Sequence, residues 1–278
     1  MQLAVGAVLY AIPLWLSGVR KVPNLTKDDF LKILPIAVLN AFGHSCAVCA
    51  MFQKGGGSFT HVIKASEPVV SVILGLLINK IVPKPLTAAS LLPITYGVAY
   101  ASTLGQLDFS TMSKELTTKA AKLAMGSNIA FSLRSILRKN VLTAEFKKRT
   151  HLDASNEHAL TTLLSFLLTI PFALASESTS KMGDTFALLS KTNALVPFLI
   201  NLFICGMSFY LYNDMQNIVL SSLGPVPTAV GNTLKRVVIF VALYLFTAGE
   251  TFPVPKIVGC AIAIAGCLGF AIFDSKKM

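Results

Sequence analysis

The sequence has few charged residues for its length. Only 13% of its 278 residues are charged, whereas a typical soluble domain has about 25%, and this excludes an ordinary water-exposed surface. Acidic residues are the scarcer kind, with 13 against 24 basic residues, so the formal net charge is +11. A nucleic-acid-binding domain is also basic, but it is far more polar. Because 54% of the residues are hydrophobic, intrinsic disorder is excluded too, and the composition indicates a polytopic membrane protein.

Cysteines and catalytic motifs are also scarce. All five cysteines lie in apolar segments, and only Cys46 and Cys49 form a CxxC pair. No second CxxC completes a zinc site, and both flanks are hydrophobic, so we interpret these thiols as packing residues in a helix. The sequence contains no Walker motif and nothing that resembles a catalytic dyad or triad. We therefore predict no metal site, no cofactor and no enzymatic activity.

Long apolar segments make up most of the chain. A transmembrane helix needs about 20 mostly apolar residues, and helix is the default because backbone polar groups must be satisfied within the segment in lipid. The sequence therefore predicts an all-α polytopic membrane protein. Its nine expected spans are 3–19, 30–50, 58–80, 86–104, 117–138, 158–176, 194–222, 226–248 and 253–273.

The connections between these spans are mostly short. Two are longer, at 139–157 and 177–193, and we interpret the charged stretch 139–157 as a flexible surface loop between two halves of the protein. When the loops are assigned to alternate sides, twelve Lys and Arg residues fall on one side and four on the other. This bias is a strong positive-inside signal, which supports the number of spans and places the C-terminus on the positive side.

Two segments of the chain resemble each other. A Pro-x-Pro sequence opens a small-residue segment at 83–102, and another opens the segment 253–272. Lys64 precedes the first Pro-x-Pro by 19 residues, and Lys235 precedes the second by 18. We interpret this match as a duplication, with a first transmembrane repeat at 1–138, a charged connecting loop at 139–157 and a second repeat at 158–278.

The two lysines lie five spans apart, so their helices should run through the membrane in opposite directions. This is the geometry of an inverted repeat with a five-helix unit, which is typical of secondary transporters. Two such units need ten helices, and we expect the missing one to precede residue 1. The chain opens on an apolar run without a signal peptide or a visible transit peptide. We therefore expect either a start within a longer precursor or a lost first helix.

Three cations lie well inside predicted spans: Lys64, Lys235 and Arg236. A charge at the bilayer centre costs about 2.5–3.5 kcal/mol even on the insertion scale, so such residues usually face a cavity and bind something. Together these cations would suit a phosphate or another dianion, with Arg236 bidentate and the lysines as point charges. The alternative is that the lysines reach the membrane surface or pair internally, as Lys64 could with Glu67 three residues later.

Four further polar residues are candidates for the same pocket. His44 lies in the second span and Tyr212 in the seventh, while Thr60 and His61 lie about one turn before Lys64. For each of them, a packing role is an equally good interpretation.

Two stretches resemble the signatures of the plastid phosphate translocators. The first is SFTHVIKA at 58–65, followed by Glu67-Pro68, and the second is Gly231-Asn232 followed by KRVV at 235–238. The stretch NIAFSLRSILRK at 128–139 and the Gly43-His44 pair also fit. The resemblance covers nearly the whole chain. It implies membership of the drug/metabolite transporter superfamily. Proteins of this family are similar in hydropathy to the nucleotide-sugar transporters.

The resemblance implies a fold of ten helices in two inverted five-helix repeats. It also implies strict counter-exchange of inorganic phosphate for a triose, pentose or hexose phosphate, 3-phosphoglycerate or phosphoenolpyruvate. The positions of Lys64, Lys235 and Arg236 would hold the phosphate group, and those of His44 and Tyr212 would line the same pocket. The expected surroundings are membrane lipid, in the plastid inner envelope, with no nucleic acid as a partner.

The chain departs from the family pattern in two respects. We expect the first helix of the family to be missing from the chain, and Gly55-Gly56-Gly57 replaces a more apolar stretch before Ser58. Two alternatives stay open at this point: a nucleotide-sugar transporter of the Golgi or endoplasmic reticulum, and a truncated member that does not transport. The sequence from Thr60 to Lys64 favours the hexose- and pentose-phosphate branches of the family over the triose-phosphate branch.

Overall fold

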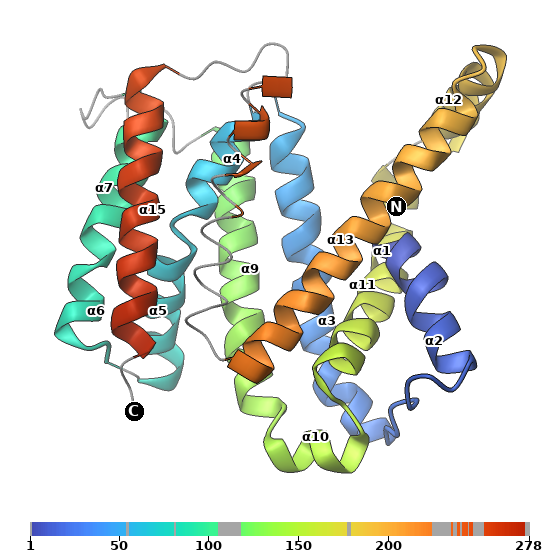
Figure 1. Cartoon of the computed structure of the whole chain (residues 1–278), viewed down its shortest axis with the longest axis horizontal. Helices are drawn as coiled ribbons and strands as arrows, with labels where there is room; N and C mark the ends of the chain where they lie inside the picture. The colour runs from blue at the N-terminus through green and yellow to red at the C-terminus, as the bar shows by residue number, and fades with distance from the viewer. Residues whose placement is uncertain are drawn as a thin grey trace. The chain divides into compact units, whose positions relative to one another are not determined.

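The computed structural model describes residues 2–53, 56–80, 82–104, 118–176, 179–223 and 253–275, and scattered positions between 235 and 246. The elements in these ranges are all helices, in agreement with the all-α prediction (Figure 1). The chain divides into two compact units. Unit 1 comprises 1–41 and 137–222, and unit 2 comprises 42–136 and 223–278. The boundaries of the predicted repeats stay a prediction.

Unit 1 opens with three consecutive helical pieces in place of the first predicted span. These are α1 (Gln2–Gly6), the π-helical η1 (Ala7–Ala11) and α2 (Ile12–Leu16). Two long helices, α3 (Lys27–Met51) and α9 (Lys119–Val141), each begin in one unit and end in the other. The remaining helices of unit 1 are α10 (Ala144–Thr150), α11 (Ala154–Ser176), α12 (Thr179–Lys191) and α13 (Leu195–Leu223), of which α13 extends one residue beyond the unit.

Unit 2 holds the helices of the third, fourth and ninth predicted spans. The third span is divided into α4 (Gly56–Lys64) and α5 (Glu67–Asn79), and the fourth into α6 (Pro85–Ala89) and α7 (Leu91–Ser102). The ninth is the single helix α15 (Val254–Ser275). The eighth span, 226–248, lies largely outside the described residues.

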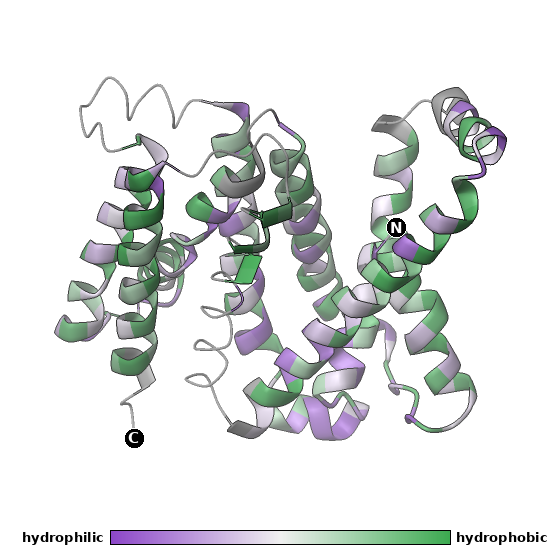
Figure 2. Cartoon of the chain, turned by 45° about the horizontal axis from the view of Figure 1, so that its top comes forward, coloured by the Kyte–Doolittle hydropathy of each residue, from purple (hydrophilic) through white to green (hydrophobic). Residues whose placement is uncertain are grey.

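Several of these helices suit a bilayer. Within the described residues, four helical stretches are long and apolar enough to cross a membrane: Lys27–Met51, Phe59–Asn79, Leu195–Val219 and Val254–Phe273. Large apolar side chains along them are exposed, such as Leu77 at 70% and Val196 at 64%, and Figure 2 shows hydrophobic residues along most of the long helices. Soluble proteins rarely present such extended apolar surface to water. The chain is therefore a polytopic α-helical membrane protein.

The third span is interrupted where the sequence predicted one continuous helix. Helix α4 ends at Lys64, and α5 begins at Glu67 with Pro68 in its first turn. Proline has no N–H, so Pro68 cannot donate the helical hydrogen bond to the carbonyl of Lys64. The interruption places Lys64 at the end of a helix inside the span.

The connection at 139–157 contains a helix, which corrects its interpretation as a flexible loop. The Thr143 hydroxyl caps α10 by accepting a hydrogen bond from the Phe146 N–H. From the end of the helix, the Arg149 guanidinium donates two hydrogen bonds to Asp29, at 2.6 and 2.9 Å. This contact raises the pKa of Arg149 above its ordinary value. Arg149, one of the charges that suggested a solvated loop, instead ties the connection to α3. The other long connection, 177–193, consists mostly of α12.

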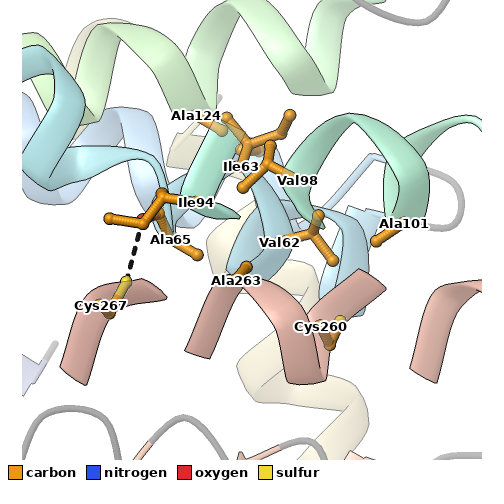
Figure 3. Packing of buried hydrophobic residues seen from close by; sticks show 11 residues of the cluster. Val62, Ile63, Ala65, Ile94, Val98, Ala101, Ala124, Cys260, Ala263 and Cys267 are labelled. Atoms are coloured by element: carbon orange, nitrogen blue, oxygen red, sulfur yellow. Dashed lines mark hydrogen bonds between the residues drawn. The ribbon is translucent and has the colours of Figure 1, made fainter. Parts of the chain in front are cut away.

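Helices α7 and α15 cross at very close range in unit 2, where they lie side by side (Figure 1). A Cβ atom added at Gly97 would lie 2.4 Å from the Ala263 nitrogen, and one at Gly259 would lie 2.5 Å from the Ala101 nitrogen. The buried cluster beside this crossing combines side chains of α4, α7 and α15 (Figure 3). Small residues allow the backbones to approach, as in many membrane helix pairs.

Gly97→Val should destabilise unit 2 because the new side chain would meet backbone atoms that cannot move away alone. Overpacking of this kind costs about 1–3 kcal/mol, so we expect a clear drop in the midpoint of thermal unfolding in detergent. Gly75→Val on α5 is the matched control, since a Cβ at Gly75 meets nothing within 4 Å. Equal midpoints for the two variants would contradict the close crossing.

Candidate functional site

The predicted phosphate-binding residue Lys64 lies at the end of α4 and is half-buried. Its ammonium donates a hydrogen bond to the Ser127 hydroxyl on α9, with 3.0 Å between Nζ and Oγ. The same nitrogen lies 4.6 Å from the ring centroid of Phe131, one turn further along α9, within the range of a cation–π interaction. The cation is thus held inside the protein by a hydroxyl and an aromatic face.

Two further polar side chains, those of His44 and Arg134, lie against the Phe131 ring. The His44 ring on α3 meets it edge-on, with 5.0 Å between ring centroids. The guanidinium carbon of Arg134 lies 4.9 Å from the ring centroid, and the ring itself is buried, with 8% of Phe131 exposed. Gly43 permits this packing, because a Cβ there would lie 2.9 Å from the ring. One aromatic ring therefore connects His44, Lys64 and Arg134.

The interruption after Lys64 is held by side chains from two neighbouring helices and by Ser66 within the interruption. The Asn128 amide on α9 donates to the Ile63 carbonyl at 3.0 Å and to the Ser66 hydroxyl at 3.2 Å. The Ser66 hydroxyl donates to the same Ile63 carbonyl at 2.7 Å. From α15, the Cys267 thiol donates to the Ala65 carbonyl at 3.5 Å, the dashed line of Figure 3. These bonds satisfy backbone groups that a continuous helix would have paired internally.

The other predicted pocket residues differ in their surroundings. Thr60 is fully buried, and its hydroxyl has no hydrogen-bond partner among the described residues, while His61 beside it is half-buried. Tyr212 belongs to unit 1, where its hydroxyl donates to Gln216 at 2.6 Å. Lys235 belongs to unit 2 and is exposed.

Arg236 lies outside the described residues. Of the predicted site residues, the structure thus brings His44 and Lys64 together around one ring and places Thr60 and His61 on the helix that ends at Lys64.

Sequence reasoning missed Ser127 and Phe131. Their signal is their spacing: Ala120, Ala124, Ser127 and Phe131 recur every three or four residues and are all buried. This is the pattern of one helical face. Because most of these residues are small, the pattern is easily taken for simple helix packing.

The site contains groups that bind oxyanions and no group of metal ligands in the part of the chain that the structure describes. An ammonium, an imidazole and hydroxyls donate hydrogen bonds to phosphate or carboxylate oxygens. The partly buried position of Lys64 strengthens such a bond relative to water. The cysteines Cys46 and Cys49 are both free thiols.

The comparisons with known proteins agree with this chemistry. The model of the Triose-phosphate Transporter family matches residues 1–271. Phosphoenolpyruvate/phosphate translocator 1, chloroplastic, of Oryza sativa subsp. japonica is 33% identical over 266 residues, which cover 96% of this chain and 61% of that protein.

Two further relatives are similar to the same degree. The triose phosphate/phosphate translocator of non-green plastids from Brassica oleracea var. botrytis is 32% identical over 96% of this chain and 62% of its own length. The xylulose 5-phosphate/phosphate translocator, chloroplastic, of Arabidopsis thaliana is 30% identical over 99% of this chain and 62% of its own length. The chain spans about six-tenths of the length of these relatives.

Proposed function

The chain belongs to the triose-phosphate transporter family, and on this premise we propose that it is a membrane antiporter that exchanges inorganic phosphate for a phosphorylated sugar or C3 compound. The relatives are translocators of phosphate with phosphoenolpyruvate, triose phosphate or xylulose 5-phosphate. Their names support C3 and C5 substrates, and C6 phosphates extend the same class. Their chloroplastic location supports a plastid envelope membrane, and their activity supports transport without covalent chemistry.

The surroundings of Lys64 carry this proposal. Its ammonium lies within a membrane-spanning stretch, at a helix interruption, bonded to Ser127 and facing the Phe131 ring. Ionisable residues inside membrane spans are functional by default, and secondary transporters build substrate sites at discontinuous helices. Three groups would hold the phosphate: the Lys64 and Lys235 ammonium groups and the Arg236 guanidinium. His44, Thr60, His61 and Tyr212 would contact the rest of the substrate.

Neutralisation of positive charge by the substrate would couple binding to movement. A loaded site carries less net charge than an empty one, so the loaded carrier should cross between its two states more readily. Exchange then becomes obligatory, because the carrier returns only with a second substrate bound. The interruption between α4 and α5 offers a place where such a movement could be absorbed.

Reconstitution into liposomes tests the proposal. We expect labelled phosphate to leave loaded vesicles at least about tenfold faster when external phosphate, phosphoenolpyruvate or a triose, pentose or hexose phosphate is present, as expected for a charge-gated return step. Fast efflux without any counter-substrate would contradict obligatory exchange. Competition by UMP or GMP, and not by sugar phosphates, would instead indicate a nucleotide-sugar carrier, and no phosphate movement would indicate a chain that does not transport.

A further inference from the structure

Ser127 lies beside the ammonium of Lys64, the residue proposed to bind phosphate. To bind phosphate well, this ammonium must be held in one direction. The lysine ammonium sits on a flexible four-carbon stem and does not hold one orientation by itself. Ser127 is fully buried, and its Oγ accepts a hydrogen bond from the Lys64 Nζ at 3.0 Å. An ammonium has three N–H donors, so a bond to Ser127 is compatible with a bond from the same nitrogen to a phosphate oxygen.

The backbone beside Lys64 is held by Asn128, the residue that follows Ser127 on α9. Asn128 is also fully buried, and its amide donates to the Ile63 carbonyl at 3.0 Å. Consecutive residues of α9 therefore hold both the end of α4 and the tip of the Lys64 side chain. The Phe131 ring attracts the ammonium as well, but a ring face accepts a cation over a broad area. Ser127 supplies a directional contact.

We propose that Ser127 is a positioning residue for phosphate binding, which acts through Lys64 and does not need to contact the substrate. This inference rests on the proposed function. Without the hydroxyl, the Lys64 ammonium keeps its charge and its place near Phe131 but loses the hydrogen bond that directs it toward Ser127. Phosphate should then bind more weakly, whereas the loaded carrier should move at nearly the same rate.

Ser127→Ala and Ser132→Ala form a matched pair of variants. Ser132 lies on the same helix, is equally buried at 1% exposed, and its hydroxyl bonds Ser71 at 2.8 Å without contacting Lys64. We expect Ser127→Ala to raise the KM for phosphate about five- to tenfold, the effect of one lost hydrogen bond, with the maximal exchange rate within about twofold. Ser132→Ala should leave KM unchanged. Equal KM values in the two variants, with an active parent, would overturn the proposal.

Chemical labelling separates this inference from the transport activity. In liposomes without phosphate, the rate at which acetic anhydride labels each lysine can be followed by mass spectrometry. Ser127→Ala should change the labelling rate of Lys64 severalfold relative to Lys139 in the same sample, while Ser132→Ala should not. An unchanged Lys64 rate would overturn the positioning role even if the parent chain exchanged no phosphate. A changed rate in an inactive parent would support it and refute only the proposed function.

Discussion

Lys64→Met should lower the rate of phosphate exchange roughly a hundredfold or more. Loss of one partner from a buried charge pair costs about 2–5 kcal/mol, and 2.8 kcal/mol corresponds to about a hundredfold in affinity. Methionine has a similar length and is apolar, so it should occupy the same place beside the Phe131 ring and the protein should fold. The measurement is counter-exchange of labelled phosphate by the purified variant in liposomes.

The control for this variant is Lys139→Met. Lys139 lies in the last turn of α9 and is exposed, so its replacement removes the same charge without touching the site. Lys64→Arg is informative as well: it keeps the charge but cannot reproduce the compact ammonium between Ser127 and Phe131, and we expect exchange between that of the parent and that of Lys64→Met. Normal exchange by Lys64→Met would place the phosphate site elsewhere.

The longest helices could be predicted from length and hydropathy alone. The expected spans 30–50 and 194–222 correspond to α3 (Lys27–Met51) and α13 (Leu195–Leu223). A bilayer imposes a minimum length of apolar helix, so these boundaries follow from local sequence. The interruption of the third span was not predicted. Pro68 is a signal for it, but hydropathy alone does not show where an apolar segment divides into two helices.

The site was predictable only in part. Lys64 could be identified because a cation in an apolar membrane segment is energetically costly and usually has a function. Its partners Ser127 and Phe131 lie more than 60 residues away in the sequence, and which face of α9 meets α4 depends on the packing of whole helices. Asn128 opens the stretch 128–139 that resembles the translocators, but its bond to the Ile63 carbonyl could not be predicted, because the sequence does not show that the helix is interrupted there.

The ion pair between Arg20 and Asp214 in unit 1 should have the largest effect on stability. Arg20, in the connection after α2, donates to the fully buried Asp214 of α13, with 2.9 Å between Nη2 and Oδ2. Burial lowers the pKa of Arg20, but the hydrogen bond to Asp214 and its charge outweigh this effect and raise it above its ordinary value. Arg20 therefore stays charged throughout the physiological range.

Arg20→Met should destabilise the protein by about 3 kcal/mol, because it leaves the Asp214 carboxylate buried and uncompensated. This is the lower end of the usual range of 3–5 kcal/mol, since 20% of the Arg20 side chain is exposed. We expect the midpoint of thermal unfolding in detergent to fall by about 6–12 °C, at about 2–4 °C per kcal/mol for a chain of this size.

The double variant Arg20→Met/Asp214→Asn should recover most of that loss, because a neutral amide costs far less to bury than a carboxylate. Lys21→Met is the control for removal of a neighbouring charge, since the Lys21 side chain is exposed and the substitution keeps the backbone carbonyl that accepts from Asn156. If the double variant were no more stable than Arg20→Met, the loss would come from the contact of the Arg20 guanidinium with the Tyr10 ring, whose centroid lies 5.7 Å from the guanidinium carbon. Recovery would instead show that Arg20 is needed because Asp214 is charged.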